Sequence, residues 1–162
     1  MLDNIIVVTM LETPHVAVGA AIASKIPNPF IAIPLAFVSH FVLEKVPHWN
    51  PHIFSETKRF GRPTNKSITI IAIDVTTALI TGSLIAWQAM PNIGHAVTIM
   101  AASLVSVLPD LIEAPYFFWK MRNKTIKSWL NFHKALQVDT TPFWGLLTQV
   151  LTIVAAILWI KN

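Results

Sequence analysis

The 162-residue sequence contains no cysteine and few charged residues, which make up only 12% of the chain. The absence of cysteine excludes a disulfide framework and a thiolate metal site. So little charge beside a hydrophobic content of 54% lies outside the range of ordinary soluble domains and predicts an integral membrane protein. Residues 1–10 contain no Lys or Arg, so the basic region of a cleavable signal peptide is missing. We therefore expect the amino terminus to be retained.

Five hydrophobic segments approach the roughly 20 residues that a membrane-spanning helix needs. Prolines and polar residues separate them, as at Pro27 and Pro29 and at Pro91. The sequence therefore predicts an all-α fold, a polytopic helical bundle that forms one integral membrane domain over residues 1–162. The predicted spans are 11–26, 29–46, 67–90, 93–119 and 142–160.

The distribution of basic residues explains the formal net charge of +4 without a nucleic-acid partner. These residues concentrate in the segments 47–66 and 119–137, which face the same side of the predicted bundle. By the positive-inside rule that side is cytoplasmic. We expect a protein of the cytoplasmic (inner) membrane with its amino terminus in the cytoplasm.

Within 119–137, Ile126, Trp129 and Leu130 share one helical face and lysines surround them. This pattern is typical of an amphipathic helix that lies in the membrane interface. A solvated basic connector is the alternative interpretation.

Ionisable residues occur inside the predicted spans, where a carboxylate costs about 2.5 to 3.5 kcal/mol at the bilayer centre. Counting a rise of ~1.5 Å per residue from the inner helix ends places them in one inner slab. His40 and Glu44 are four residues apart, and Asp110 and Glu113 are three apart, so each pair shares a helix face. The candidate metal ligands are His15, His40, Glu44, His48, Asp74 and Asp110.

Imidazole combined with carboxylate suits zinc, manganese or a related divalent ion, and the number of carboxylates matches one or two such ions. Water activated by the ion would be the nucleophile, with Glu113 or Glu44 as general base. His133 is a candidate cover for the site, or else a headgroup anchor. In the alternative interpretations, Asp74 and Asp110 form hydrogen bonds between helices and Glu44 is solvated at the interface.

Three short motifs occur in order along the chain. They are His15-x-x-x-Gly19, Ser39-His40-x-x-Leu43-Glu44-x-x-Pro47-His48, and Leu108-Pro109-Asp110. Together they resemble the pattern of the YdjM-like small inner-membrane proteins, predicted metal-dependent hydrolases that are more distantly similar to zinc-dependent phospholipase C.

This resemblance implies that His15, His40, Glu44 and Asp110 are metal ligands, and that His48 is a ligand or supports one. Two positions differ from the family pattern. Glu44 stands where the family has Asp, and Asp110-Leu-Ile-Glu113 replaces an Asp-x-Asp-His continuation.

The combined features predict a membrane-embedded metal-dependent hydrolase that acts on a lipid or lipid-linked phosphate at the cytoplasmic leaflet. Membrane lipids are the expected partners, because the basic segments would attract anionic headgroups. An ion or proton transporter is one alternative, although within the outer half only His95 is available as an ionisable group on a through-path. A non-catalytic membrane scaffold held together by its carboxylates is another.

Overall fold

The structure is a computed structural model that describes residues 10–162, and in this range every regular element is a helix. The predicted all-α fold is therefore confirmed, whereas the expectation of a retained amino terminus concerns residues 1–9, outside the described range. The helices are α1 (Glu12–Lys25), α2 (Pro29–Leu43), α3 (Ile53–Phe60), α4 (Asn65–Trp87), α5 (Ile93–Ser106), α6 (Leu108–Leu111), α7 (Ala114–Phe118), α8 (Lys124–Leu136) and α9 (Pro142–Lys161).

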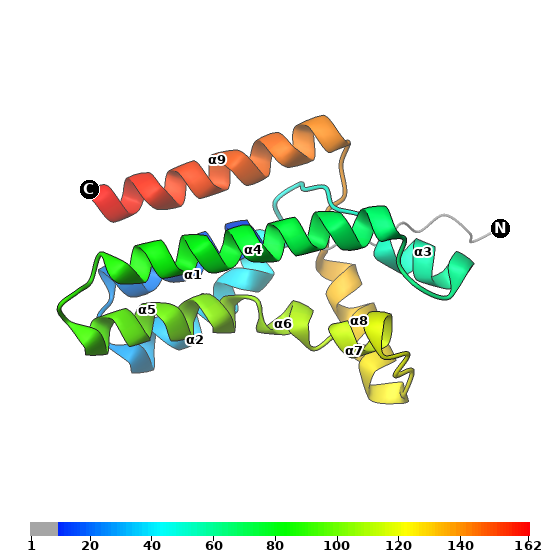
Figure 1. Ribbon diagram of the computed structural model, residues 1–162, viewed down its shortest axis with the longest axis horizontal. Coiled ribbons are helices and arrows are strands. Elements are labelled where there is room, and N and C mark those ends of the chain that lie inside the picture. The colour runs from blue at the N-terminus through cyan, green and yellow to red at the C-terminus, as the bar shows by residue number, and fades with distance from the viewer. Residues whose placement is uncertain (1–9) are drawn as a thin grey trace.

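Helix α1 lies at the centre of the bundle, where it contacts α2, α4, α5 and α9 (Figure 1). The start of a helix leaves backbone N–H groups without intrahelical partners. Here side chains from other parts of the chain accept them: Glu44 accepts from Met10, Gln149 from Leu11, and Asp74 from Glu12 and Thr13. Contacts from three directions therefore hold the first turn of α1 in place.

Two helices, α4 and α9, are each long and apolar enough to cross a membrane. Helix α5 is followed, after a bend of 51°, by the segment that contains α6 and α7. These two parts make a third such segment if they count as one span. By contrast, α1 and α2 contain only 14 and 15 residues. They are therefore ~21 and ~22 Å long, short of the ~30 Å hydrocarbon core.

The prediction of five spans was thus wrong in number, since the structure supports two or three. Hydrophobicity misled the prediction at α1, because most of the residues in this helix are buried among its neighbours. An apolar segment covered on all sides by protein has the same composition as one that faces lipid.

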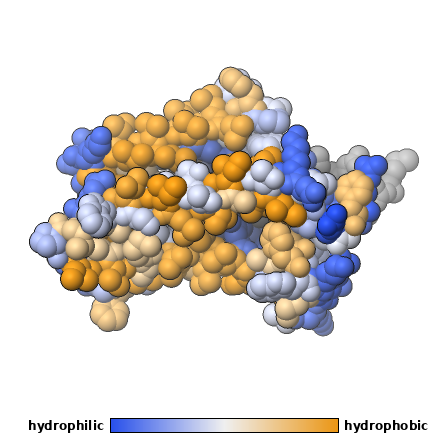
Figure 2. Space-filling view, viewed as in Figure 1, coloured by the Kyte–Doolittle hydropathy of each residue, from blue (hydrophilic) through white to orange (hydrophobic). Residues whose placement is uncertain are grey.

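The outer surface of the helices is strongly apolar. Figure 2 shows hydrophobic residues across the helices that face the viewer, and hydrophilic residues gathered mainly at the end that carries α3 and α8. Leu84 on α4 and Val150 on α9 are 61% and 55% exposed. Soluble monomers rarely expose apolar surface of this extent, so the arrangement is consistent with membrane association.

Two connections differ from the sequence prediction. The polar loop expected over residues 47–66 contains the helix α3, and the amphipathic segment expected over 119–137 forms a shorter helix, α8. Leu130 and Ile126 of α8 pack on Phe54 of α3 and on Tyr116 of α7. The apolar face assigned to the membrane interface is therefore occupied largely by protein.

Candidate metal centre

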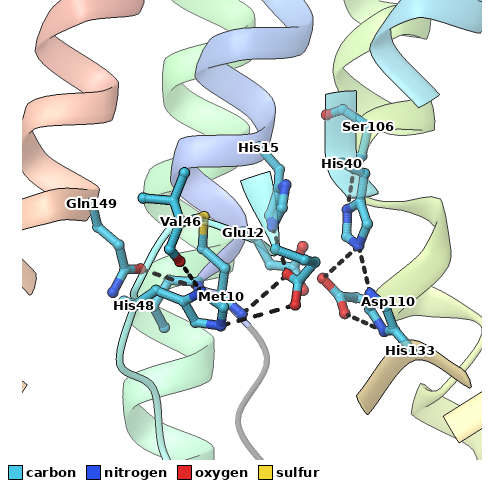
Figure 3. Close-up of polar contacts among 12 residues, drawn as sticks. Met10, Glu12, His15, His40, Val46, His48, Ser106, Asp110, His133 and Gln149 are labelled. Atoms are coloured by element: carbon cyan, nitrogen blue, oxygen red, sulfur yellow. Dashed lines mark hydrogen bonds and ion pairs between the residues drawn. The ribbon is translucent and has the colours of Figure 1, made fainter. Parts of the chain in front are cut away.

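Histidines and carboxylates from α1, α2, α6 and α8 converge at the end of the bundle where α1 begins (Figure 3). Two groups of residues offer possible ligand atoms, and within each group these atoms all lie within 4.8 Å of one another. The first contains His15, His40, Glu44 and Asp110, and the second contains Asp110, Glu113 and His133. Asp110 belongs to both, so the two groups adjoin at its carboxylate.

A break in the chain before Asp110 supplies acceptors to this centre. Pro109 has no N–H with which to continue the helix from α5, and the chain bends between Ser106 and α6. The Ser106 carbonyl accepts a hydrogen bond from Nδ1 of His40 at 2.7 Å, and the Pro109 carbonyl accepts one from Nε1 of Trp129 at 3.0 Å. The break therefore orients a histidine of α2 and also attaches α8.

Close contact between α1 and α5 sets the position of His15. A Cβ atom added to Gly19 would lie 2.7 Å from Cβ of Ser106 and 3.0 Å from the carbonyl oxygen of Ala102. Only glycine allows the two helices to approach this closely. One turn away along α1, the His15 ring then stacks on the His40 ring with their centroids 4.1 Å apart.

His40 and His133 face each other through nitrogen atoms that both lack a proton in the neutral rings. Nδ1 of His40 must donate to the Ser106 carbonyl, and Nδ1 of His133 lies 2.8 Å from Oε1 of the Glu113 carboxylate, to which it donates. Each Nε2 then carries a lone pair, yet the two Nε2 atoms are 2.9 Å apart. The contact therefore requires either a proton on one of the two Nε2 atoms or a metal ion bound to both.

His133 lies on α8, outside the helices that could cross a membrane. Burial lowers its pKa, but the hydrogen bond to Glu113 and the charges of Glu113 and Glu44 outweigh burial, so that the pKa of His133 is raised above its ordinary value. The surroundings of this ring therefore favour positive charge at the centre.

Several buried atoms of the centre need more than one proton to satisfy them. Nε2 of His48, Oε2 of Glu44 and both carboxylate oxygens of Asp110 have no hydrogen-bond partner. Among residues 10–162, every ion pair includes a histidine, so no Lys or Arg neutralises these carboxylates. Buried carboxylates without a cationic partner are costly, and a divalent ion among these nitrogen and oxygen atoms would remove that cost.

Asp74, a predicted ligand, lies apart from both groups. Its carboxylate accepts from the backbone N–H of Glu12 at 2.6 Å and of Thr13 at 3.3 Å, and from the Thr13 hydroxyl at 2.6 Å. Negative charge at the start of a helix is stabilising. The structure therefore places Asp74 as a cap of α1 from α4, outside both candidate metal-binding groups.

His48 occupies an intermediate position. Its Nδ1 donates to the carbonyl of Val46 at 2.8 Å, which leaves Nε2 as the free nitrogen, 3.9 Å from Oε2 of Glu44. The ring is completely buried. This placement fits either a ligand or a residue that supports Glu44.

Glu12 was not predicted. It lines a cavity beside Asp110 and Glu113, and its Oε2 is buried without a hydrogen-bond partner. An acidic residue in the first turn of a helix normally indicates a favourable interaction with the helix dipole, which is why its position attracted no functional interpretation. Its spacing of three residues from His15 was the available signal, because such residues share a helix face.

Comparison of the chain with protein-family models, curated proteins and solved structures finds no match. Fold and centre together define a helical protein with two helices long and apolar enough to cross a membrane, and with a buried histidine–carboxylate group that could hold a metal ion.

Proposed function

We propose that this protein is a membrane-embedded, metal-dependent hydrolase acting on a lipid or lipid-linked phosphate at the cytoplasmic leaflet. The observation that carries the proposal is the buried pair His40 and His133, whose Nε2 atoms are 2.9 Å apart among carboxylates without a Lys or Arg partner in the described range. The order of the His15, His40 and Asp110 motifs, which resembles that of the YdjM-like predicted hydrolases, supports the same assignment.

The ligand set comprises Nε2 of His40 and of His133 with His15, Glu44 and Asp110. Metal-binding histidines usually donate their other ring N–H to a carboxylate or a backbone carbonyl. His40 does so to the Ser106 carbonyl, and His133 does so to Glu113. Because Asp110 belongs to both groups, the centre suits one ion or two that share this carboxylate. Zinc and manganese both accept such mixed nitrogen and oxygen ligands.

A divalent ion held there would supply Lewis acidity to a phosphoryl group and to water. The protein's own contribution is a group that takes a proton from the attacking water. Glu44 and Glu113 were the sequence candidates, but Glu44 belongs to the ligand set and Oε1 of Glu113 accepts from His133. Glu12 faces the cavity with a free oxygen, so we assign the proton-accepting role to Glu12 and the positioning of His133 to Glu113.

The positions of the basic residues indicate where an anionic substrate would bind. Lysines and arginines of α3, of α8 and of the segments beside them lie at the end of the molecule that carries the centre (Figure 2). Each basic residue near an anionic membrane surface contributes about 1 kcal/mol of attraction. A substrate with a phosphate head is therefore concentrated at the inner surface beside the metal centre.

Metal analysis of the purified full-length protein tests the proposal directly. We expect at least one zinc or manganese ion per chain, and loss of this ion in His40→Ala and Asp110→Ala. His95→Gln is the matched control, because His95 lies at the other end of the bundle and binds only the Ala23 carbonyl through Nε2. Wild-type protein free of metal after purification without chelator, and unable to take up either ion, would refute the proposal.

A further inference from the structure

Two cavities lie end to end beside the metal centre. The first, of about 160 Å³, reaches Asp110 and Glu113, and the second, of about 120 Å³, lies between α1, α4 and α5. Both are lined by Glu12, Val75 and Leu111, so they adjoin. We call these two adjoining cavities together the α4–α5 groove.

The groove leads from the centre along the middle part of α4 (Asn65–Trp87). Along α4 its lining begins at Ile71 and ends at Gly82. The eleven residue-to-residue steps from Ile71 to Gly82 correspond to about 16 Å, which is close to half of the ~30 Å hydrocarbon core. The groove therefore has the length of one leaflet, with the carboxylates at the end nearest the inner surface.

The walls of the groove suit hydrocarbon. Its deeper part is lined almost wholly by apolar side chains, among them Val16, Leu79, Leu104 and Val107. Apolar cavities of about 150 Å³ bind benzene and exclude water. Leu79 and Leu104 are also 55% and 51% exposed on the outer surface of the helices, so the groove is bordered by side chains that would face lipid.

We propose that the α4–α5 groove binds an aliphatic chain of the substrate, which enters sideways from the inner leaflet and places its phosphate head at Asp110 and Glu113. This inference rests on the proposed function and narrows its substrate to lipids that combine long aliphatic chains with a phosphate monoester as the head group. A chain of an inner-leaflet lipid runs from its head toward the midplane, which is the direction of the groove.

A third cavity, which is also mainly apolar, flanks the other side of α4 but does not lead to the centre. It has a volume of about 370 Å³ and lies between α4 and α9. Its only ionisable lining residue is Asp74, which lies outside both metal-binding groups. The Asp74 carboxylate is engaged by Glu12 and Thr13. Lipid in that cavity would have no access to the two metal-binding groups.

The variants Leu79→Trp and Leu104→Trp fill the groove from its two walls. Their matched controls are Ile80→Trp and Val97→Trp, since Ile80 and Val97 lie on the same helices, are 54% and 60% exposed, and line neither cavity of the groove. All four substitutions enlarge exposed side chains, so they place similar demands on folding. Circular dichroism and size-exclusion chromatography verify this for each variant.

The probe is phosphatidic acid with a diazirine in the middle of one acyl chain, used in trace amounts in phosphatidylcholine nanodiscs that hold the full-length protein. After irradiation, mass spectrometry locates the labelled residues. We expect labelling near Leu79 and Leu104 about tenfold above that near Ile80 and Val97, and a loss of about tenfold in both groove variants but in neither control, as for two lost methylene contacts. A phosphatidylcholine probe with the same chain should show no such concentration.

Equal labelling of the groove and of the outer helix surface, or equal labelling by the two lipids, would overturn the inference and identify the occupant as bulk bilayer lipid. Metal content measured on the same samples separates this result from failure of the proposed function. Metal-containing protein with uniform labelling contradicts the groove alone. Metal-free protein with labelling concentrated in the groove contradicts the hydrolase but retains the lipid site.

Discussion

The two ends of the helix bundle share α1 and α2 but are packed in opposite ways. At the end away from the centre, small side chains let α1, α2, α4 and α5 approach closely around Ile85 and Ile99. The remaining members of this buried cluster are Ala20, Ala23, Ala32, Ala36, Ala86 and Ala102. At the end where α1 begins, histidines of α1 and α2 meet Asp110 of α6 and His133 of α8, beside the α4–α5 groove.

The difference assigns structural support to the alanine-rich end and the candidate chemistry to the end with the metal centre. Small residues at helix contacts give dense packing, and rigid elements are what hold a constellation of ligands in place. Among residues 10–162, no buried carboxylate lies in the alanine-rich half, so the described part of the chain offers no continuation of the metal-binding groups across the bundle. That favours a one-sided reaction centre over a conduction path.

The largest effect is expected from Asp110→Asn. Asp110 belongs to both metal-binding groups, and an amide keeps its shape but not its charge. Metal affinity should fall by at least about 100-fold, the upper range for loss of groups that only support a ligand. Isothermal titration with zinc measures it. A scaffold held together by hydrogen bonds would tolerate the amide, so unchanged metal binding and unchanged stability would support that alternative.

Glu113→Gln should have a smaller effect on the same measurement. The amide no longer holds the N–H of His133 with a charge-assisted hydrogen bond, so metal affinity should decrease by about 10- to 100-fold. Asp139→Asn is the control, because Asp139 is exposed. If Glu113→Gln binds zinc as tightly as the wild type, Glu113 does not position His133.

Gly19→Ala tests the coupling between helix packing and the centre. Its Cβ would lie 2.7 Å from Cβ of Ser106, so α1 and α5 must separate, at a cost of about 1 to 3 kcal/mol. Denaturant unfolding in detergent measures this loss. Gly94→Ala is the control, because its Cβ would meet only the Asn92 side chain at 3.7 Å. A Gly19→Ala protein as stable as the Gly94→Ala protein would show that the close approach is unnecessary.

Asp74→Asn should have the smallest effect and should spare the metal. The amide can still accept from the first turn of α1 but lacks the charge that favours a helix start, a loss of about 1 kcal/mol in unfolding free energy. Metal content should equal that of the wild type. Loss of metal in this variant would instead restore Asp74 as a ligand.

Much of the centre was predictable because the spacing of residues along a helix determines which of them share a face and how deep each lies. The four-residue interval between His40 and Glu44 and the common depth of His15 and Asp110 both follow from the rise and turn of a helix. The carbonyls freed near Pro109 have the same kind of local cause, since proline cannot continue the backbone hydrogen bonding of a helix. The structure places all four of these ionisable residues in one group.

The sequence by itself determined the apolar helices, the scarcity of charge and the residues able to bind a metal, because these depend on composition and local periodicity. Only the tertiary structure decided that α1 is a buried central helix and not a full span, that Asp74 caps it, and that His133 reaches His40 across 93 positions of sequence. Burial and pairing depend on which surfaces meet, and no local pattern specifies the partner of a helix face.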